Sequence, residues 1–125
     1  MIFGCGIDIE EPERFNKHYF AEGKLSDLIY DIFSTREIEN FSVFGKEAFL
    51  KGFSFKESFY KAIHDENVGF KDIEIFFNTD GRVHIKSSAL LTDLLKNLKI
   101  NEIKTEFQET EKYVISKVIL IQKNE

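Results

Sequence analysis

The stretch Phe53-Ser-Phe-Lys-Glu-Ser-Phe-Tyr-Lys-Ala-Ile63 contains two overlapping helical patterns. Glu57 and Lys61 are four residues apart, so a helix places them one turn apart on the same side. An acid and a base side by side on a half-buried helix can hold a metal ion and a phosphate together, or can form an ordinary surface ion pair. The apolar residues recur at helical spacing and predict one buried stripe: Phe55, Phe59, Ala62 and Ile63.

Another candidate site residue, Asp8, lies in the first apolar segment of the chain, residues 2–9. This short run contains two glycines, which predict a buried strand that another backbone approaches closely. A carboxylate is costly to bury without a partner, so we expect Asp8 either at solvent or against a cation. Cys5 is predicted to be a buried structural thiol. Because it is the only cysteine, an intrachain disulfide and a cysteine-based zinc site are excluded.

Length and composition predict one globular domain over residues 1–125. The chain is 42% hydrophobic and 31% charged, and its fourteen Phe and no Trp predict a Phe-rich core. The net charge of −5 argues against a general nucleic-acid binder. No apolar run approaches the roughly 18 residues of a membrane span, and no basic segment precedes the first apolar run as in a signal peptide. We therefore expect a cytoplasmic protein without a membrane partner.

Helices are predicted through most of the first half. Pro12 and Gly23 mark the ends of the first helix, and Ser34 with Glu37 forms a capping box at the start of the third. Gly52 is expected to kink or divide the longest helix. The expected ranges are 12–20, a short helix through Phe33, 34 to about 41, and 46–64.

Strands are predicted mainly in the second half. Asp80-Gly81 is a strong hairpin signal between the first two strands, and Ser87 or Ser88 caps a helix before the third. Because hairpin connections dominate, we predict an α+β fold with a largely antiparallel sheet packed against the long central helix. The expected strand ranges are 70–78, 83–85, 100–107 and 113–122.

The order and spacing of these motifs resemble the 4′-phosphopantetheinyl transferase superfamily, in particular its small holo-acyl-carrier-protein synthase group. The resemblance covers nearly the whole chain. It implies transfer of 4′-phosphopantetheine from coenzyme A to a serine of an acyl-carrier protein, with release of 3′,5′-ADP. It also implies a homotrimer with coenzyme A at the subunit boundaries. The matching motifs are Gly6-Ile-Asp-Ile9 with Glu13-Arg-Phe15, Phe33-Ser-Thr-Arg-Glu37, and Lys56-Glu-Ser-Phe-Tyr-Lys-Ala62.

The resemblance also implies roles for individual residues. Asp8 and Glu57 match the family's Mg²⁺ ligands, and carboxylate oxygens suit this hard ion. Lys61 matches the phosphate-binding lysine, and Glu57, or a water that it holds, is the candidate general base. Further contacts with coenzyme A are expected from Lys56 and Arg82. The acidic carrier protein is expected to contact basic residues on and just beyond the first helix: Arg14, Lys17 and Lys24.

The sequence departs from the family pattern at three places. The acidic segment 63–67 replaces a Gly-Thr-Gly type loop, Gly52 replaces an arginine, and Gln108-Glu109 stands where Ser and His are usual. These changes leave a second hypothesis open, a catalytically weakened relative that binds a carrier protein or partner subunit without efficient transfer. A third is a structural module in which Asp8 and Glu57 are only paired surface acids.

Overall fold

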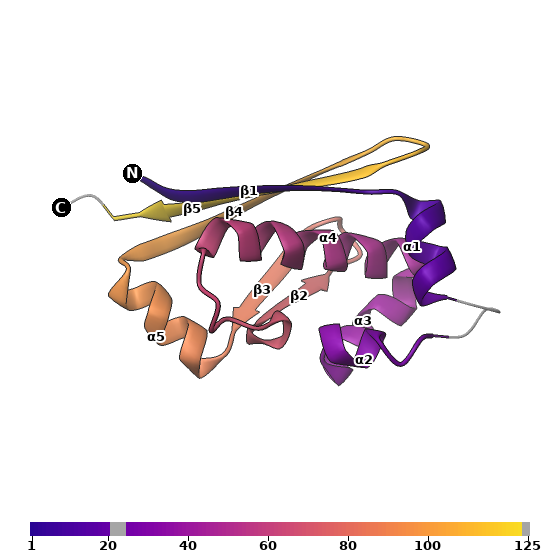
Figure 1. Cartoon of the computed structure of the whole chain (residues 1–125), viewed down its shortest axis with the longest axis horizontal. Helices are drawn as coiled ribbons and strands as arrows, with labels where there is room; N and C mark the ends of the chain where they lie inside the picture. Colours follow the sequence, from indigo (N-terminus) through magenta and orange to yellow (C-terminus); the bar gives the residue numbers. More distant parts are fainter. Residues whose placement is uncertain (21–24, 124–125) are drawn as a thin grey trace.

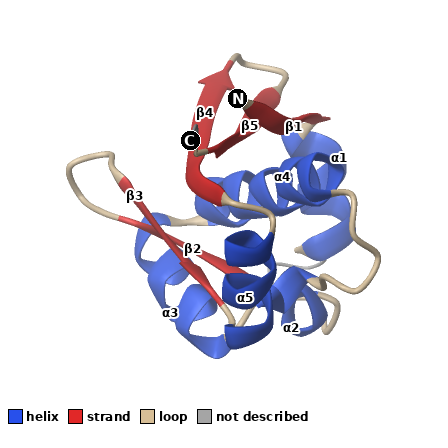
Figure 2. Cartoon of the chain, turned by 90° about the vertical axis from the view of Figure 1, so that its left-hand side faces the viewer, coloured by secondary structure: helices blue, strands red, loops and turns tan. Residues whose placement is uncertain are grey.

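One long helix, α4 (Lys46–Ile63), lies between two antiparallel sheets in a computed structural model of the chain, which describes residues 1–20 and 25–123 (Figure 1). The larger sheet has the strand order β1-β5-β4, and the smaller one is the β2-β3 hairpin. Figure 2 shows the three-stranded sheet above α4 and the hairpin below it. The predicted antiparallel α+β architecture is confirmed, with two sheets instead of one. The strands are β1 (Ile2–Glu10), β2 (Ile73–Phe77), β3 (Val83–Ser87), β4 (Ile100–Glu109) and β5 (Val114–Gln122).

The shorter helices gather at the two ends of α4 (Figure 1). In the described residues they are α1 (Pro12–Tyr19), α2 (Ile29–Ile32), α3 (Thr35–Phe44) and α5 (Ala89–Asn97), with a 3₁₀ turn, η2 (Phe70–Asp72). Gly23 and Lys24, which the sequence placed at the end of the first helix, lie outside the described residues. None of the helices in the described part of the chain is both long and apolar enough to cross a lipid bilayer.

Local polar signals set the ends of several elements. The capping box is confirmed: Ser34 Oγ accepts from the Glu37 backbone N–H at 3.1 Å, and Glu37 Oε1 accepts from the Ser34 N–H at 3.0 Å. Ser88 caps α5, with its Oγ accepting from the Leu91 N–H at 3.2 Å. The Asp80-Gly81 turn joins β2 and β3 as predicted.

The core is built around α4 and is rich in phenylalanine. Its predicted apolar stripe is confirmed, since Phe55, Phe59, Ala62 and Ile63 are all buried. The expectation that Gly52 divides the long helix is wrong, because α4 continues through this residue. A Cβ at this position would lie 2.8 Å from a Phe41 ring carbon and 3.2 Å from a Phe33 ring carbon. Gly52 is therefore a packing position that makes room for the rings of two other helical segments.

Strand β1 packs directly on the backbone of α4. Gly4 and Gly6 face the helix so closely that a Cβ on either would overlap the carbonyl of Ala62 or of Ser58, respectively. This close approach confirms the reason predicted for the glycines. It also fixes which side of the strand faces inward, because alternate residues of a strand point to opposite sides. The inward side carries Gly4, Gly6 and Asp8.

The outward side of β1 contradicts the prediction of a fully buried strand. Cys5 is exposed, so its prediction as a buried thiol is wrong. Ile7 and Ile9 are 52% and 59% exposed. The sequence run is apolar on both sides, but only the glycine side contacts α4. The other side forms part of an isoleucine-rich surface on the three-stranded sheet.

Candidate functional site

The candidate site begins where the end of β1 meets the middle of α4. Asp8 is buried, with 7% of its surface exposed, although it lies near the end of an edge strand. Lys61 Nζ donates hydrogen bonds to Asp8 Oδ1 at 3.3 Å and to the Ile7 carbonyl at 3.0 Å. Of the two expectations for Asp8, contact with a cation is the one confirmed. The expected Glu57–Lys61 pair is replaced by this contact between strand and helix.

A hollow of about 660 Å³ opens beside these residues, between β1, α4 and α1. Its acidic wall is formed by three carboxylates from β1 and α4: Asp8, Glu10 and Glu57. Its opposite wall is formed by basic residues of α1: Arg14, Lys17 and His18. The structure thus brings the predicted metal and partner residues to one cavity. The hollow is therefore lined by acidic residues of β1 and α4 and by basic residues of α1.

Glu10 is a site residue that the sequence analysis missed. Burial raises its pKa to about 8, helped by a hydrogen bond to Asp8 and by the negative charges of Asp8 and Glu57, while Lys61 opposes the shift. The period of two along a strand was the available signal, because it places residues 8 and 10 on the same side. Glu10 therefore shares the environment of Asp8, and its carboxyl is mostly protonated at pH values below about 8.

The pKa of Glu57 is also raised. Burial is the main cause that raises its pKa, and the negative charge of Asp8 adds to the shift, whereas Lys61 lowers it. Burial and the charges of Glu10 and Glu57 also raise the pKa of Tyr19, which lines the hollow. Burial is the largest cause of all three shifts, and the neighbouring carboxylates add to each, so a cation bound beside these carboxylates would favour their charged forms.

The residues present fit a hard divalent cation. Asp8 Oδ2 is buried, and among residues 1–20 and 25–123 it receives no hydrogen bond unless a neutral Glu10 donates one. The same residues contain no group of three or more His, Cys, Asp or Glu arranged to hold a metal ion. Mg²⁺ needs no such group, since it commonly uses one or two carboxylates and takes its other ligands from water and substrate phosphates. Asp8 and Glu57 would supply these two carboxylates.

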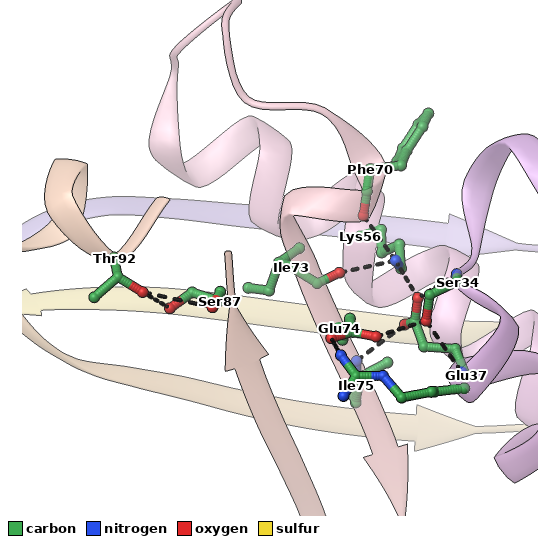
Figure 3. Close-up of polar contacts among 10 residues, drawn as sticks. Ser34, Glu37, Lys56, Phe70, Ile73, Glu74, Ile75, Ser87 and Thr92 are labelled. Atoms are coloured by element: carbon green, nitrogen blue, oxygen red, sulfur yellow. Dashed lines mark hydrogen bonds and ion pairs between the residues drawn. The ribbon is translucent and has the colours of Figure 1, made fainter. Parts of the chain in front are cut away.

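Lys56 lies away from this hollow, although it was predicted to contact coenzyme A. It is 1% exposed, and its ammonium donates to Glu37 Oε1 at 2.7 Å (Figure 3). It also donates to carbonyls of Phe70 at 2.7 Å, Ile73 at 2.8 Å and Ile32 at 3.2 Å. All its donors are used within the protein. The geometry therefore leaves no Lys56 N–H for a phosphate.

The partner of Lys56 connects it to the surface through a chain of polar contacts. Glu37 Oε2 accepts from the Ile75 N–H at 3.0 Å, which fixes the carboxylate against β2. The Ser34 hydroxyl donates to Glu74 at 2.6 Å, and Arg36 pairs with the same carboxylate at 2.8 Å. Burial lowers the pKa of Lys56 and raises that of Glu37, and their mutual attraction opposes both shifts.

This network ties α2, α3, α4 and β2 together. The sequence contained a signal for it, because Lys56 falls on a buried helical stripe with Gly52, Phe59 and Ile63.

The remaining candidates are divided between two places. Arg14 and Lys17 line the hollow, as described. Arg82 lies on the hairpin turn with its side chain 85% exposed, 3.8 Å from Asp80, and is not part of the hollow. Glu109, one of the departures from the family pattern, forms an ion pair with Lys51 of α4. Its carboxylate is therefore held beside Lys51, in the first half of α4.

The comparisons with known proteins agree with this fold and site. A profile of the 4′-phosphopantetheinyl transferase superfamily matches residues 4–118. The chain is 34% identical over 109 residues to a holo-[acyl-carrier-protein] synthase of Caldicellulosiruptor saccharolyticus, covering 82% of this chain and 83% of the relative. It is 31% identical to that of Fusobacterium nucleatum, covering 97% and 100%. The chain therefore belongs to the 4′-phosphopantetheinyl transferase superfamily, in its holo-acyl-carrier-protein synthase group.

Solved structures show the same fold. The holo-[acyl-carrier-protein] synthase of Neisseria meningitidis superimposes with a TM-score of 0.79 at 25% identity, covering 98% of this chain and 100% of that one. The Helicobacter pylori enzyme, solved in complex with coenzyme A, gives a TM-score of 0.76 at 19% identity, covering 94% and 99%. The similarity extends over whole chains, so the two-sheet arrangement around α4 is the fold of the group.

Proposed function

We propose that this protein transfers the 4′-phosphopantetheine group of coenzyme A to a serine of an acyl-carrier protein and releases 3′,5′-ADP. One observation carries the proposal: Asp8, which pairs with Lys61, and Glu57 line one hollow together with basic residues of α1. Phosphoryl-type transfer depends mainly on positioning and charge neutralisation, which this arrangement supplies. The family relationship supports the same reaction.

The activity is proposed to depend on Mg²⁺. Asp8 and Glu57 would hold the ion, which when bound neutralises charge on the pyrophosphate oxygens. The support comes from the buried Asp8 oxygen without a protein donor and from the raised pKa of Glu57. Asp8 pairs with Lys61 through its other oxygen, Oδ1, so the proposed ion would add positive charge beside Oδ2 and Glu57.

Lys61 and Glu57 have distinct proposed roles. Two of the three Lys61 N–H donors go to Asp8 and the Ile7 carbonyl, which leaves one for a phosphate oxygen of coenzyme A. Glu57, directly or through a water, accepts the proton of the carrier serine, and its raised pKa makes the carboxylate a stronger base. Lys56 takes no part in these contacts because its donors are internal. For Arg82, which does not line the hollow, we propose contact with coenzyme A that is bound to a neighbouring subunit.

The carrier protein is proposed to dock on α1. Arg14 and Lys17 are exposed and line the rim of the hollow, so an acidic partner bound there delivers its serine toward Glu57. The chain as a whole carries −5, so long-range attraction of an acidic partner is absent. Only this local patch can steer the encounter.

A homotrimer is proposed from the outward face of the three-stranded sheet. In addition to Ile7 and Ile9, this face carries alternate residues of β5 that are only partly buried: Ile115, Ile119 and Ile121. Such a face needs cover that no described element of the same chain supplies. A cytoplasmic location stays a prediction from the sequence.

The second candidate function is a weakened relative that binds a carrier protein or partner subunit without efficient transfer. It is favoured by the acidic loop after Ala62, where Asp65 and Glu66 offer no cation for a phosphate, and by the Glu109–Lys51 pair, which neutralises a lysine of α4.

The two functions are separated by incubating the protein with coenzyme A, Mg²⁺ and a panel of apo carrier proteins, followed by intact mass measurement. A gain of one phosphopantetheine on any carrier, absent with Glu57→Gln, supports transfer. A panel that binds but gains no mass supports the second function.

A further inference from the structure

A second hollow, of about 450 Å³, lies near the end of the molecule that carries α5 and the last strand residues (Figure 1). It is lined by residues of α5, the end of β3, the start of β4 and the segment after β5. Among the described residues that line it there is no acid. Its polar lining consists of three lysines, two hydroxyls and one amide: Lys96, Lys99, Lys123, Ser87, Thr92 and Asn101.

The backbone holds the three lysines together. Lys96 is in the last turn of α5, and the Lys99 N–H donates to its carbonyl at 3.0 Å. The Lys123 N–H donates in turn to the Lys99 carbonyl at 2.9 Å. Gln122 reinforces this junction by donating from Nε2 to the Leu98 carbonyl at 2.9 Å. The backbones of three lysines from two distant parts of the sequence are thus held close together, and their exposed side chains line one hollow.

The ordinary role of lysine at a helix end accounts for only part of this arrangement. Lys96 complements the negative end of the α5 dipole. Lys99 has a left-handed backbone, with φ 61°, at a position after a helix where glycine is the usual residue. Lys123 follows strand β5 and is not part of α5, so the helix dipole does not account for its position. Within residues 1–20 and 25–123, none of the ion pairs involves these lysines, in a chain that is acidic overall.

Two hydroxyls complete the lining. Ser87 Oγ and Thr92 Oγ1 are 2.6 Å apart and share one hydrogen bond (Figure 3). Each hydroxyl carries one proton, so a second O–H remains; Thr92 Oγ1 has the Ser87 carbonyl as a long contact at 3.5 Å, which a bound acceptor can replace. The hollow therefore offers ammonium and hydroxyl donors, and none of its described lining residues is acidic.

We propose that this hollow binds the phosphate group of a small anionic ligand. A phosphate dianion presents several strong acceptor oxygens and is bound by lysine as a point charge. The volume lies within the range of small-molecule sites. The site is independent of the Asp8 hollow, since the two share no lining residue. The proposal does not depend on whether the protein transfers phosphopantetheine.

The test uses the full chain with Lys61→Ala, which removes the phosphate-binding lysine of the first hollow. Inorganic phosphate and adenosine monophosphate are titrated by calorimetry in a phosphate-free buffer at constant ionic strength. We expect saturable binding of both. Lys99→Ala and Lys123→Ala should each weaken it about two- to fivefold, the effect of losing one exposed charge pair. Lys112→Ala, on the distant β4–β5 turn, is the matched control and should leave affinity unchanged.

Two results would overturn the proposal. One is the absence of saturable binding by the Lys61→Ala protein. The other is equal affinity in the Lys99, Lys123 and Lys112 variants, which would make the binding a general effect of surface charge. Circular dichroism confirms that each variant is folded, as expected for exposed lysines. Binding of adenosine monophosphate without inorganic phosphate would also contradict a site built for the phosphate group.

Discussion

Glu10 lies beside Asp8 on the inward side of β1, where burial, a hydrogen bond to Asp8 and the negative charges of Asp8 and Glu57 raise the pKa of its carboxyl to about 8. Ionisation of Glu10 breaks that bond and adds a third negative charge to the hollow. A carboxyl whose pKa is raised in the folded state stabilises the fold when it is protonated. The relationship between these residues therefore makes stability depend on pH near neutrality.

The first prediction concerns this dependence. The stabilisation from Glu10 is fully present below pH 4.5 and is lost as pH rises through about 8, because the folded state binds more protons than the unfolded state in this window. The melting temperature should fall across this window without divalent ions. Glu10→Gln should flatten the fall, whereas Glu13→Gln, on the exposed start of α1, should not. A slope that is the same in all three proteins would contradict the assignment to Glu10.

The second prediction concerns the divalent ion. Asp8→Ala and Glu57→Ala should each abolish Mg²⁺-dependent binding of coenzyme A, because each removes one of the two proposed ligands. The fold should survive, since Lys61, the partner of Asp8, has a half-exposed side chain and can be solvated. Calorimetry with and without Mg²⁺ measures the effect. Unchanged affinity for metal and coenzyme A in both variants would show that the site assignment is wrong.

The third prediction concerns the buried ion pair. Lys56→Met leaves the Glu37 carboxylate buried without its cation and should lower the free energy of unfolding by about 3–5 kcal/mol. The matched control is Lys51→Ala, which removes a partly exposed pair with Glu109 and should cost about 0–1 kcal/mol. Urea denaturation gives both values. A Lys56 variant as stable as the Lys51 variant would rule out a structural role for the pair.

The fourth prediction concerns the contact between β1 and α4. Gly6→Ala places a methyl group against the Ser58 carbonyl and should destabilise the protein by about 1–3 kcal/mol, the usual cost of overpacking. It should also weaken coenzyme A binding, because it lifts Asp8 away from Lys61. Gly69→Ala is the control: its Cβ would meet only Asp72 Oδ2, at 3.6 Å, and its backbone is extended. Thermal melts should separate the two variants clearly.

The fifth prediction concerns the carrier protein. The double variant Arg14→Glu, Lys17→Glu should raise the KM for the carrier about twofold to thirtyfold, as expected for two exposed pairs of about 0.2–1 kcal/mol each. The salt dependence of KM should disappear, because screening acts on the lost attraction. The turnover number at saturation should change much less. Lys86→Glu on β3 serves as control, and equal carrier kinetics for the double variant and wild type at low salt would move the docking surface elsewhere.

Patterns that depend on neighbouring residues predicted much of this molecule. The stripe of Phe55 and Phe59, the Ser34 capping box and the Asp80-Gly81 turn are all encoded within a few residues, and each is found where it was expected. Contact of Asp8 with a cation was one of the two expectations for this residue, whereas the identity of that cation as Lys61 is set by the packing of β1 on α4.

The misses have a common physical origin in contacts between distant segments. Nothing near Cys5 shows which side of an apolar strand will face α4, since this is decided by where the glycines meet the helix backbone. Lys56 resembles a surface lysine until Glu37 and three carbonyls from other segments surround it. Glu10 is one acid among several until Asp8 and Glu57 raise its pKa.

The glycine contact between β1 and α4 has a consequence for how the site responds to fluctuation. No side-chain layer separates the two backbones, so the strand cannot shift along the helix by changing rotamers. Asp8 belongs to one backbone and Lys61 to the other, and their spacing is therefore as rigid as the core itself. The amide protons with which β1 pairs to β5 should exchange with solvent only when the whole protein unfolds, which gives the site the same lifetime as the native state.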